Sequence, residues 1–208
     1  MRLIEQLGQA LIRIMKLKEA EQFNAAQIEI NLAGKMLLGL DMELLRALSD
    51  EEIISLLKPT GELDSGKCLM AAELLKEEAD IQERQGQLQE SAASYAVSLS
   101  LFLEAALTNK QVRSTEYIEK IDFICGKLTD FHLPANIKLK QFRYCELIGE
   151  LARAEDCLYE LIESDSADYI ETGIKFYKRL LQLDDAELAR GNLPRDEVKE
   201  GLQALNCL

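Results

Sequence analysis

The sequence predicts an all-α protein, and three observations indicate this class. Apolar residues recur at spacings of three and four along most of the chain, no segment sustains an alternation of period two, and several connections are only one to four residues long. With 48% hydrophobic and 29% charged residues, the composition is that of a globular protein. We expect a single α-helical domain over residues 1–208, with a candidate sub-boundary near residues 58–62.

The first part of the chain predicts two long amphipathic helices and two short ones. In the first helix the positions of one stripe are apolar from Leu3 to Met15, and the last position of the same stripe is Lys18. Gly39 ends the second helix, and Ser49 and Glu52 form a capping box that opens the fourth. The expected segments are residues 1–20, 23–38, 41–48 and 50–57, followed by a breaker at 58–61.

The remaining helices are separated by glycine and proline signals. The expected segments are residues 63–85, 88–107, 111–129, 134–148, 151–163, a helix capped by Asp165 or Ser166 that runs to 183, and 194–205, with a short acidic turn at 184–189. The connections at Gly86 and Gly149 are very short, and short loops make consecutive helices pack antiparallel. We therefore expect a series of antiparallel helical hairpins.

Three segments share one pattern, in which a large apolar residue is followed three residues later by a small residue and then, four residues on, by another large one. The three copies are Phe23/Ala26/Ile30/Ala33, Leu88/Ser91/Tyr95/Ser98 and Leu151/Ala154/Leu158/Leu161. Their starts are 65 and 63 residues apart, close to two units of about 32 residues each. The small residue would let the two helices of a hairpin approach closely.

This pattern resembles the second helix of a tetratricopeptide repeat (TPR). The residues that carry the resemblance are Gly86, Leu88, Ser91, Tyr95 and Ser98, followed by Gly149, Leu151, Ala154 and Leu158. The whole chain is also similar to a family of uncharacterised bacterial proteins with TPR-like helices. The stretches that suggest this similarity are residues 61–68, 175–181 and 191–198. The resemblance implies hairpins stacked as a right-handed TPR-like array. It implies no activity.

Charge and cysteine usage predict the compartment and exclude several partners. A formal net charge of −13 repels phosphate backbones, which argues against nucleic acid and anionic membrane surfaces. Residues 1–20 lack the unbroken apolar run of a signal peptide or membrane span. The five cysteines contain no C-x-x-C motif, which predicts free thiols in a reducing, cytoplasmic location without a thiolate metal site.

Two features of the sequence suggest a phosphate-binding loop and a metal site, but neither has the residues that such a site requires. Residues 61–68 match G-x-x-x-x-G-K, but Cys68 replaces the hydroxyl that binds magnesium, and a helix precedes the loop where a strand is required. We expect a glycine turn there, with Asp64 or Ser65 at a helix start. His132 is the single histidine, so neither a di-iron centre nor a paired-histidine zinc site can form. We predict no catalytic, cofactor-binding or metal-binding residues.

Two runs of acidic residues could serve carboxylate chemistry. Residues 73–90 carry six acids and two bases, and residues 184–200 carry six acids and three bases. Because charge runs on amphipathic helices usually face water, we interpret both as solvated faces.

A local excess of positive charge is the candidate partner-binding site. Residues 127–143 hold four bases and one acid, beside several aromatic residues. The predicted partner-binding residues are Lys127, Lys138, Lys140, Arg143 and Tyr144. Such a patch could receive an acidic peptide. It could also offset the acidic helices of the protein itself or mediate self-association.

The leading functional hypothesis is a non-enzymatic, cytoplasmic adaptor that binds a protein, a peptide or a second copy of itself. Stacked hairpins leave grooves that serve as interaction surfaces more often than as active sites. Two alternatives stay open: a regulatory module that senses a peptide or small ligand, and a helical enzyme that uses carboxylates.

Overall fold

The computed structural model describes residues 2–59, 61–164 and 166–207. Within these residues the chain is helical and contains no strand, which confirms the all-α prediction. The elements are α1 (Arg2–Glu19), α2 (Phe23–Ala33), a π-helical turn (Gly34–Leu38), α3 (Met42–Ala47), α4 (Asp50–Leu56), α5 (Ser65–Arg84), α6 (Leu88–Thr108), a 3₁₀ turn (Lys110–Val112), α7 (Thr115–Lys127), α8 (Ala135–Ile148), α9 (Leu151–Ser164), α10 (Ser166–Leu180), α11 (Asp185–Arg190) and α12 (Arg195–Asn206).

The chain divides into two compact units, Met1–His132 (unit 1) and Leu133–Leu208 (unit 2). The division falls within the corner Phe131-His132-Leu133-Pro134, whereas the breaker at residues 58–61 lies inside unit 1. A single domain over the whole chain stays a prediction.

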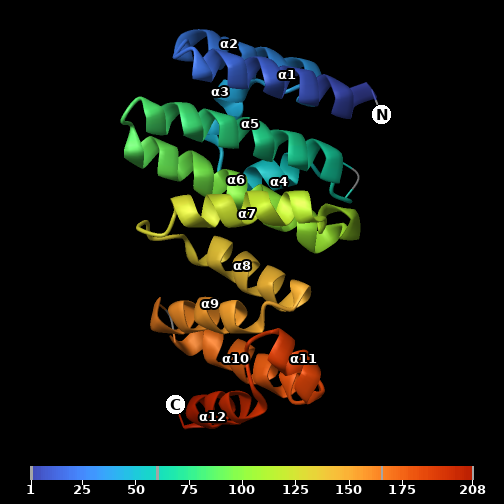
Figure 1. Cartoon of the computed structure of the whole chain (residues 1–208), viewed down its shortest axis with the longest axis vertical. Helices are drawn as coiled ribbons and strands as arrows, with labels where there is room; N and C mark the ends of the chain where they lie inside the picture. Colours follow the sequence, from blue (N-terminus) through green and yellow to red (C-terminus); the bar gives the residue numbers. More distant parts are fainter. Residues whose placement is uncertain (1, 60, 165, 208) are drawn as a thin grey trace. The chain divides into compact units, whose positions relative to one another are not determined.

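Unit 1 is built around two pairs of consecutive helices. The helix α1 packs on α2, and α5 packs along the length of α6 (Figure 1). The α2 helix and the π-helical turn that follows it contact α5, while α4 and α7 contact α6. The helix α5 therefore lies at the centre of the unit, between the first pair and its own partner.

The repeated pattern begins at the first residue of α2, α6 and α9, and each of these helices packs against the one before it. The small residues Ala26, Ser91 and Ala154 are all buried. In the central pair, the Ser91 hydroxyl donates to the Ala79 carbonyl at 2.8 Å, and the Ser98 hydroxyl donates to the Ala72 carbonyl at 2.7 Å. A side chain this short reaches a neighbouring backbone only if the two helices lie very close together.

The predicted turn and capping residues are in place. Gly86 and Gly149 adopt left-handed φ angles of 79° and 85°, which side chains disfavour. Ser49 and Glu52 form the expected capping box. The side chain of Asp64 accepts from the Lys67 backbone at 3.0 Å, so residues 61–68 are a glycine turn and a helix start, as predicted. The proposed cap at Asp165 lies outside the described residues.

Two segments differ from the prediction for local reasons. The helix expected over residues 111–129 is split, because the Asn109 side chain accepts from the Gln111 backbone at 3.0 Å and favours a 3₁₀ turn before α7 begins. The acidic turn expected at 184–189 is the short helix α11. Asp184 and Glu187 cap its start reciprocally.

The α6 helix has the length and apolar character of a membrane-spanning helix. Within the stretch of α6 that has this apolar character, 56% of the residues are buried inside the protein. A long core helix has this same property, because its apolar residues face other helices rather than lipid.

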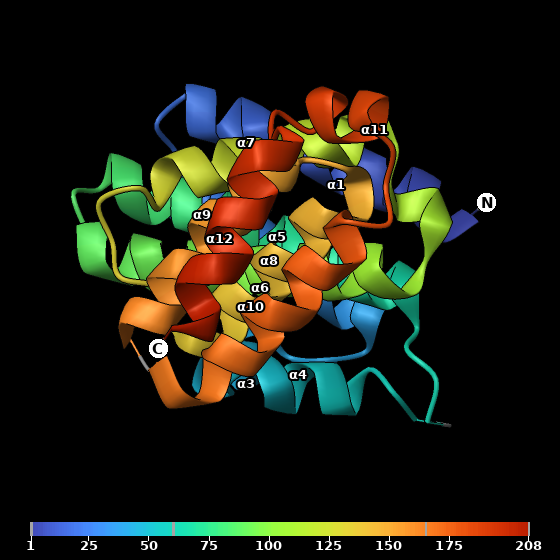
Figure 2. The same ribbon diagram turned by 90° about the horizontal axis from the view of Figure 1, so that it is seen from below.

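Unit 2 is assembled around aromatic side chains. The helix α9 contacts both α8 and α10, and α12 lies against α10 (Figure 2). The rings of Phe142 and Phe176 meet edge to face with centroids 5.3 Å apart. A Cβ atom at Gly201 would lie 2.4 Å from the Tyr177 ring, so glycine is needed for α12 to approach α10.

The close approach of α5 and α6 yields a stability prediction. Leucine at Ser91 would overfill the contact and remove the hydrogen bond to Ala79, so Ser91→Leu should lower the free energy of unfolding by about 3 kcal/mol. Ala93→Leu, at an exposed position of the same helix, is the control and should change it by less than about 0.5 kcal/mol. Urea unfolding followed by circular dichroism measures both. Equal losses of unfolding free energy in the two variants would contradict a close contact between α5 and α6 at Ser91.

Candidate functional site

The acidic run on α5 is not a solvated face, and that prediction was wrong. Glu73, Glu77 and Glu78 are only 4, 8 and 3% exposed. The second run, residues 184–200, does have all six acids exposed, as predicted. The difference is that α5 is covered by other helices of unit 1, and these helices supply partners for its charges.

Each buried or half-buried acid of α5 pairs with a base from a different part of unit 1. We call Glu73, Glu77, Glu78, Asp80 and Glu83 the α5 acid cluster. Their partners are Lys18 of α1 for Glu77 and Asp80, Arg46 of α3 for Glu78, and Lys120 and Lys127 of α7 for Glu73 and Glu83. Buried charges are tolerated only when they are paired in this way.

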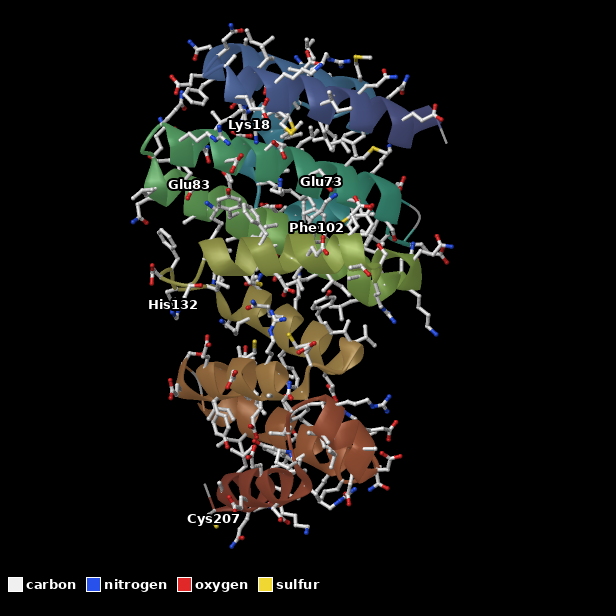
Figure 3. The ribbon with its side chains drawn as sticks, viewed as in Figure 1. Lys18, Glu73, Glu83, Phe102, His132 and Cys207 are labelled. Carbon is white, nitrogen blue, oxygen red and sulfur yellow. The ribbon has the colours of Figure 1, made fainter. Side chains whose placement is uncertain are left out.

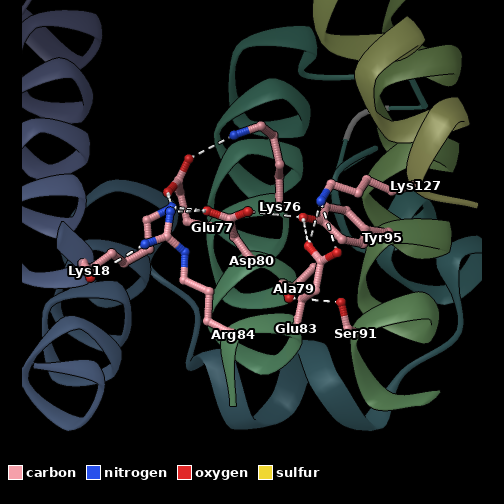
Figure 4. Close-up of polar contacts among 10 residues, drawn as sticks. All are labelled: Lys18, Lys76, Glu77, Ala79, Asp80, Glu83, Arg84, Ser91, Tyr95 and Lys127. Atoms are coloured by element: carbon pink, nitrogen blue, oxygen red, sulfur yellow. Dashed lines mark hydrogen bonds and ion pairs between the residues drawn. The ribbon is translucent and has the colours of Figure 1, made fainter. Parts of the chain in front are cut away.

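Lys18 is the most deeply buried base of this network. Its side chain is 5% exposed and points from α1 toward α5 (Figure 3). The Nζ atom donates to Glu77 and, at 2.5 Å, to Asp80 (Figure 4). Lys18 lies four residues after the buried Ile14, so the same helical face that buries the apolar stripe carries this charge into the contact with α5.

Further groups complete the surroundings of Asp80. The Tyr95 hydroxyl donates to Asp80 at 3.1 Å, and the Arg84 guanidinium lies 3.8 Å from its carboxylate. Burial opposes the charge of Asp80, but hydrogen bonds and charge from Lys18 and the Tyr95 hydroxyl outweigh it and lower the pKa of Asp80. Burial and the charges of Asp80 and Glu83 raise the pKa of Tyr95, so its hydroxyl stays a donor.

A pocket of about 380 Å³ opens beside this network, between α1 and α5. One side is apolar and the other is charged. The lining residues are Leu11, Ile12, Met15, Lys18 and Glu19 of α1, and Lys76, Glu77, Asp80 and Arg84 of α5. Ile12 and Met15 are 51 and 48% exposed, so large apolar surfaces meet water at its edge. We call this feature the α1–α5 pocket.

The predicted partner-binding residues fall in both units. Lys127, in unit 1, donates to both Glu83 oxygens at 2.8 and 2.7 Å. The other four residues lie on α8 of unit 2. Lys138 pairs with Glu160 at 2.5 Å, Lys140 is half-buried, and Arg143 is exposed. Tyr144 is 1% exposed and packs inside unit 2. The assignment of these residues to a partner stays a prediction.

The described part of the chain contains no candidate metal site, although the Cys145 and Cys157 side chains of unit 2 lie within hydrogen-bond distance of each other. No three His, Cys, Asp or Glu side chains come together there as metal ligands would. Of the five cysteines, Cys68, Cys145 and Cys157 are buried and Cys207 is exposed. His132 is exposed.

Removing the base at the centre of the network should be costly. The change Lys18→Met keeps the length of the side chain but leaves Glu77 and Asp80 without their shared partner. The free energy of unfolding should fall by about 3–5 kcal/mol. Lys16→Met removes an exposed lysine from the same helix and should change it by less than about 0.5 kcal/mol. Chemical denaturation of both variants measures the difference. If they lose the same stability, the network is not structural.

The chain was compared with protein families, curated proteins and solved structures. The model of one family, described as a family of unknown function (DUF6483), matches residues 1–208. No curated protein and no solved structure matches the chain. The family match agrees with the resemblance of the whole chain to an uncharacterised family. The chain therefore belongs to DUF6483, a family of unknown function.

Proposed function

We propose that this chain is a non-enzymatic, TPR-like module that binds a segment of another protein in the α1–α5 pocket. The observation that carries the proposal is the pairing of half-exposed apolar side chains, Ile12 and Met15, with a fixed wall of charges on α5. An apolar surface left in water beside polar groups is typical of an interaction site. A concave, partly apolar pocket with a few fixed polar groups is typical of a binding site.

Exposed apolar residues support a binding role for the first part of unit 1. Of the eleven large apolar side chains that are exposed among the described residues, seven lie between Ile12 and Leu56. Single exposed apolar residues are normal, so the support for the pocket comes from Ile12 and Met15, which adjoin each other in its lining.

The pocket is lined by three bases and three acids, and among the bases Arg84 is the one least engaged by a carboxylate. Lys18 and Lys76 both donate to Glu77, so their charges are already engaged. The side chain of Arg84 is 46% exposed, and its nearest carboxylate is at 3.8 Å rather than at hydrogen-bond distance. A guanidinium can bind a second carboxylate by donating two parallel N–H hydrogen bonds to it. The expected occupant therefore places an apolar side chain against Ile12 and Met15, and a carboxylate against Arg84.

The other parts of the proposal have separate support. The TPR-like arrangement is supported by the pattern at the start of α2, α6 and α9 and by the left-handed turns at Gly86 and Gly149. A non-enzymatic role is supported by the α5 acid cluster, because carboxylates held by lysine and arginine partners are suited to structure. A cytoplasmic location, and the exclusion of nucleic acids and membranes as partners, stay predictions from composition.

The test uses defined peptides. We would measure fluorescence anisotropy of labelled peptides that place leucine or phenylalanine beside two glutamates, and of matched peptides with lysine in place of glutamate. The acidic set should bind saturably, and the basic set about tenfold more weakly or not at all. Met15→Asp and Arg84→Glu should each weaken binding of the acidic set by about tenfold or more.

The control variant is Leu56→Asp, which changes an equally exposed apolar residue of the same unit that does not line the pocket. It should leave peptide binding unchanged. Circular dichroism checks that all three variants fold. The proposal fails if no acidic peptide binds saturably, or if Leu56→Asp weakens binding as much as Met15→Asp does.

A further inference from the structure

The outer face of the first hairpin carries an apolar stripe that is separate from the α1–α5 pocket. Ile28, Leu32 and Met36 are 60, 49 and 73% exposed. They follow one another at spacings of four residues along α2 and the π-helical turn. The buried residues of α2, Ala26, Ile30 and Ala33, lie on the opposite face of the helix.

The π-helical turn keeps this stripe straight. Positions four apart on an α-helix drift around the axis, because four residues exceed one turn of 3.6. A π-helical turn holds more residues, so Met36 stays nearly in line with Leu32. Gly34 lets Met42 of α3 pack against this turn, because a Cβ atom at Gly34 would lie 2.7 Å from the Met42 side chain. Three large apolar side chains thus form one continuous ridge.

The segment around this ridge carries few charges. Residues 20–40, which carry the ridge, contain one Lys and two Glu, a net charge of −1 in a chain of −13. The charges nearest the ridge are also paired, Arg13 with Glu29 at 2.5 Å and Lys35 with Asp41 at 3.0 Å. Two copies of this acidic chain would therefore repel each other only weakly through this face.

We propose that the ridge is the interface of a homodimer in which α2 packs antiparallel on α2 of a second copy. Because Ile28 and Met36 each lie four residues from Leu32, the ridge has the same spacing in both directions along the helix. In this arrangement Leu32 meets Leu32 of the other copy at the two-fold axis, and Ile28 meets Met36 on either side of it. The same patch then serves both chains, as an isologous interface requires. The near-neutral, internally paired charges favour a second copy over a strongly charged partner.

Sedimentation equilibrium over about a hundredfold range of protein concentration measures the association. The wild-type chain should form a dimer. Leu32→Asp would place two carboxylates face to face at the two-fold axis, and should weaken dimerisation by about a hundredfold or more. Leu44→Asp, at a similarly exposed position on α3, is the matched control and should leave the dimer intact. Circular dichroism verifies the fold of both variants.

Cross-linking tests the register and does not depend on whether Leu32→Asp folds. In a Cys207→Ser background, which removes the exposed native thiol, oxidation of Leu32→Cys should give a disulfide-linked dimer. A mixture of Ile28→Cys and Met36→Cys chains should cross-link to each other in preference to themselves, whereas Leu44→Cys should not cross-link.

The proposal is overturned if the wild-type chain is monomeric throughout, if Leu32→Asp stays dimeric, or if Leu44→Cys cross-links as fast as Leu32→Cys. None of these outcomes bears on peptide binding in the α1–α5 pocket, so the two proposals stand or fall separately.

Discussion

Ion pairs between α5 and the helices that cover it are the interaction on which unit 1 depends. Five acids on one helix meet bases from α1, α3 and α7, and the most deeply buried of these bases, Lys18, serves two of them. Burying a charge costs free energy that the pairing roughly offsets, so such contacts add little net stability. Their effect is on arrangement, because a helix that docked on the wrong face would leave charges buried without partners.

The same interaction explains why a pocket persists beside α5. Apolar side chains alone would close the space between α1 and α5, since packing removes surface from water. Here Lys18, Glu77 and Asp80 hold the helices through polar groups, and Ile12 and Met15 are left at the edge of the space rather than inside it. The exposed apolar surface is then a consequence of the network, and a binding segment could cover it without rearranging the core.

Much of the fold could be predicted from sequence, because the signals are local. The helices, the capping box at Ser49 and the turns at Gly86 and Gly149 follow from periodicity and backbone preference. The burial of the α5 acid cluster could not be predicted, because it depends on partners far away in the chain: Lys18 is 59 residues from Glu77, and Lys127 is 44 residues from Glu83. The available signal was Lys18 itself, a charge at the end of an apolar stripe. For the same reason, the local excess of positive charge at residues 127–143 did not reveal that Lys127 and Lys138 have acidic partners within their own units.

The most direct test of the central claim is the pH dependence of unfolding in the wild-type chain and in Asp80→Asn. The pKa of Asp80 is lowered from its ordinary value of 3.8 in the folded chain, so its ionisation stabilises the fold above that pH and ceases to do so as the pH falls further. Denaturation at a series of pH values from neutral to below about 4 should therefore show wild type losing stability more steeply on the acid side than Asp80→Asn. Parallel losses in the two chains would contradict the account, because Asp80 would then contribute no charge-dependent stability to the contact between α1 and α5.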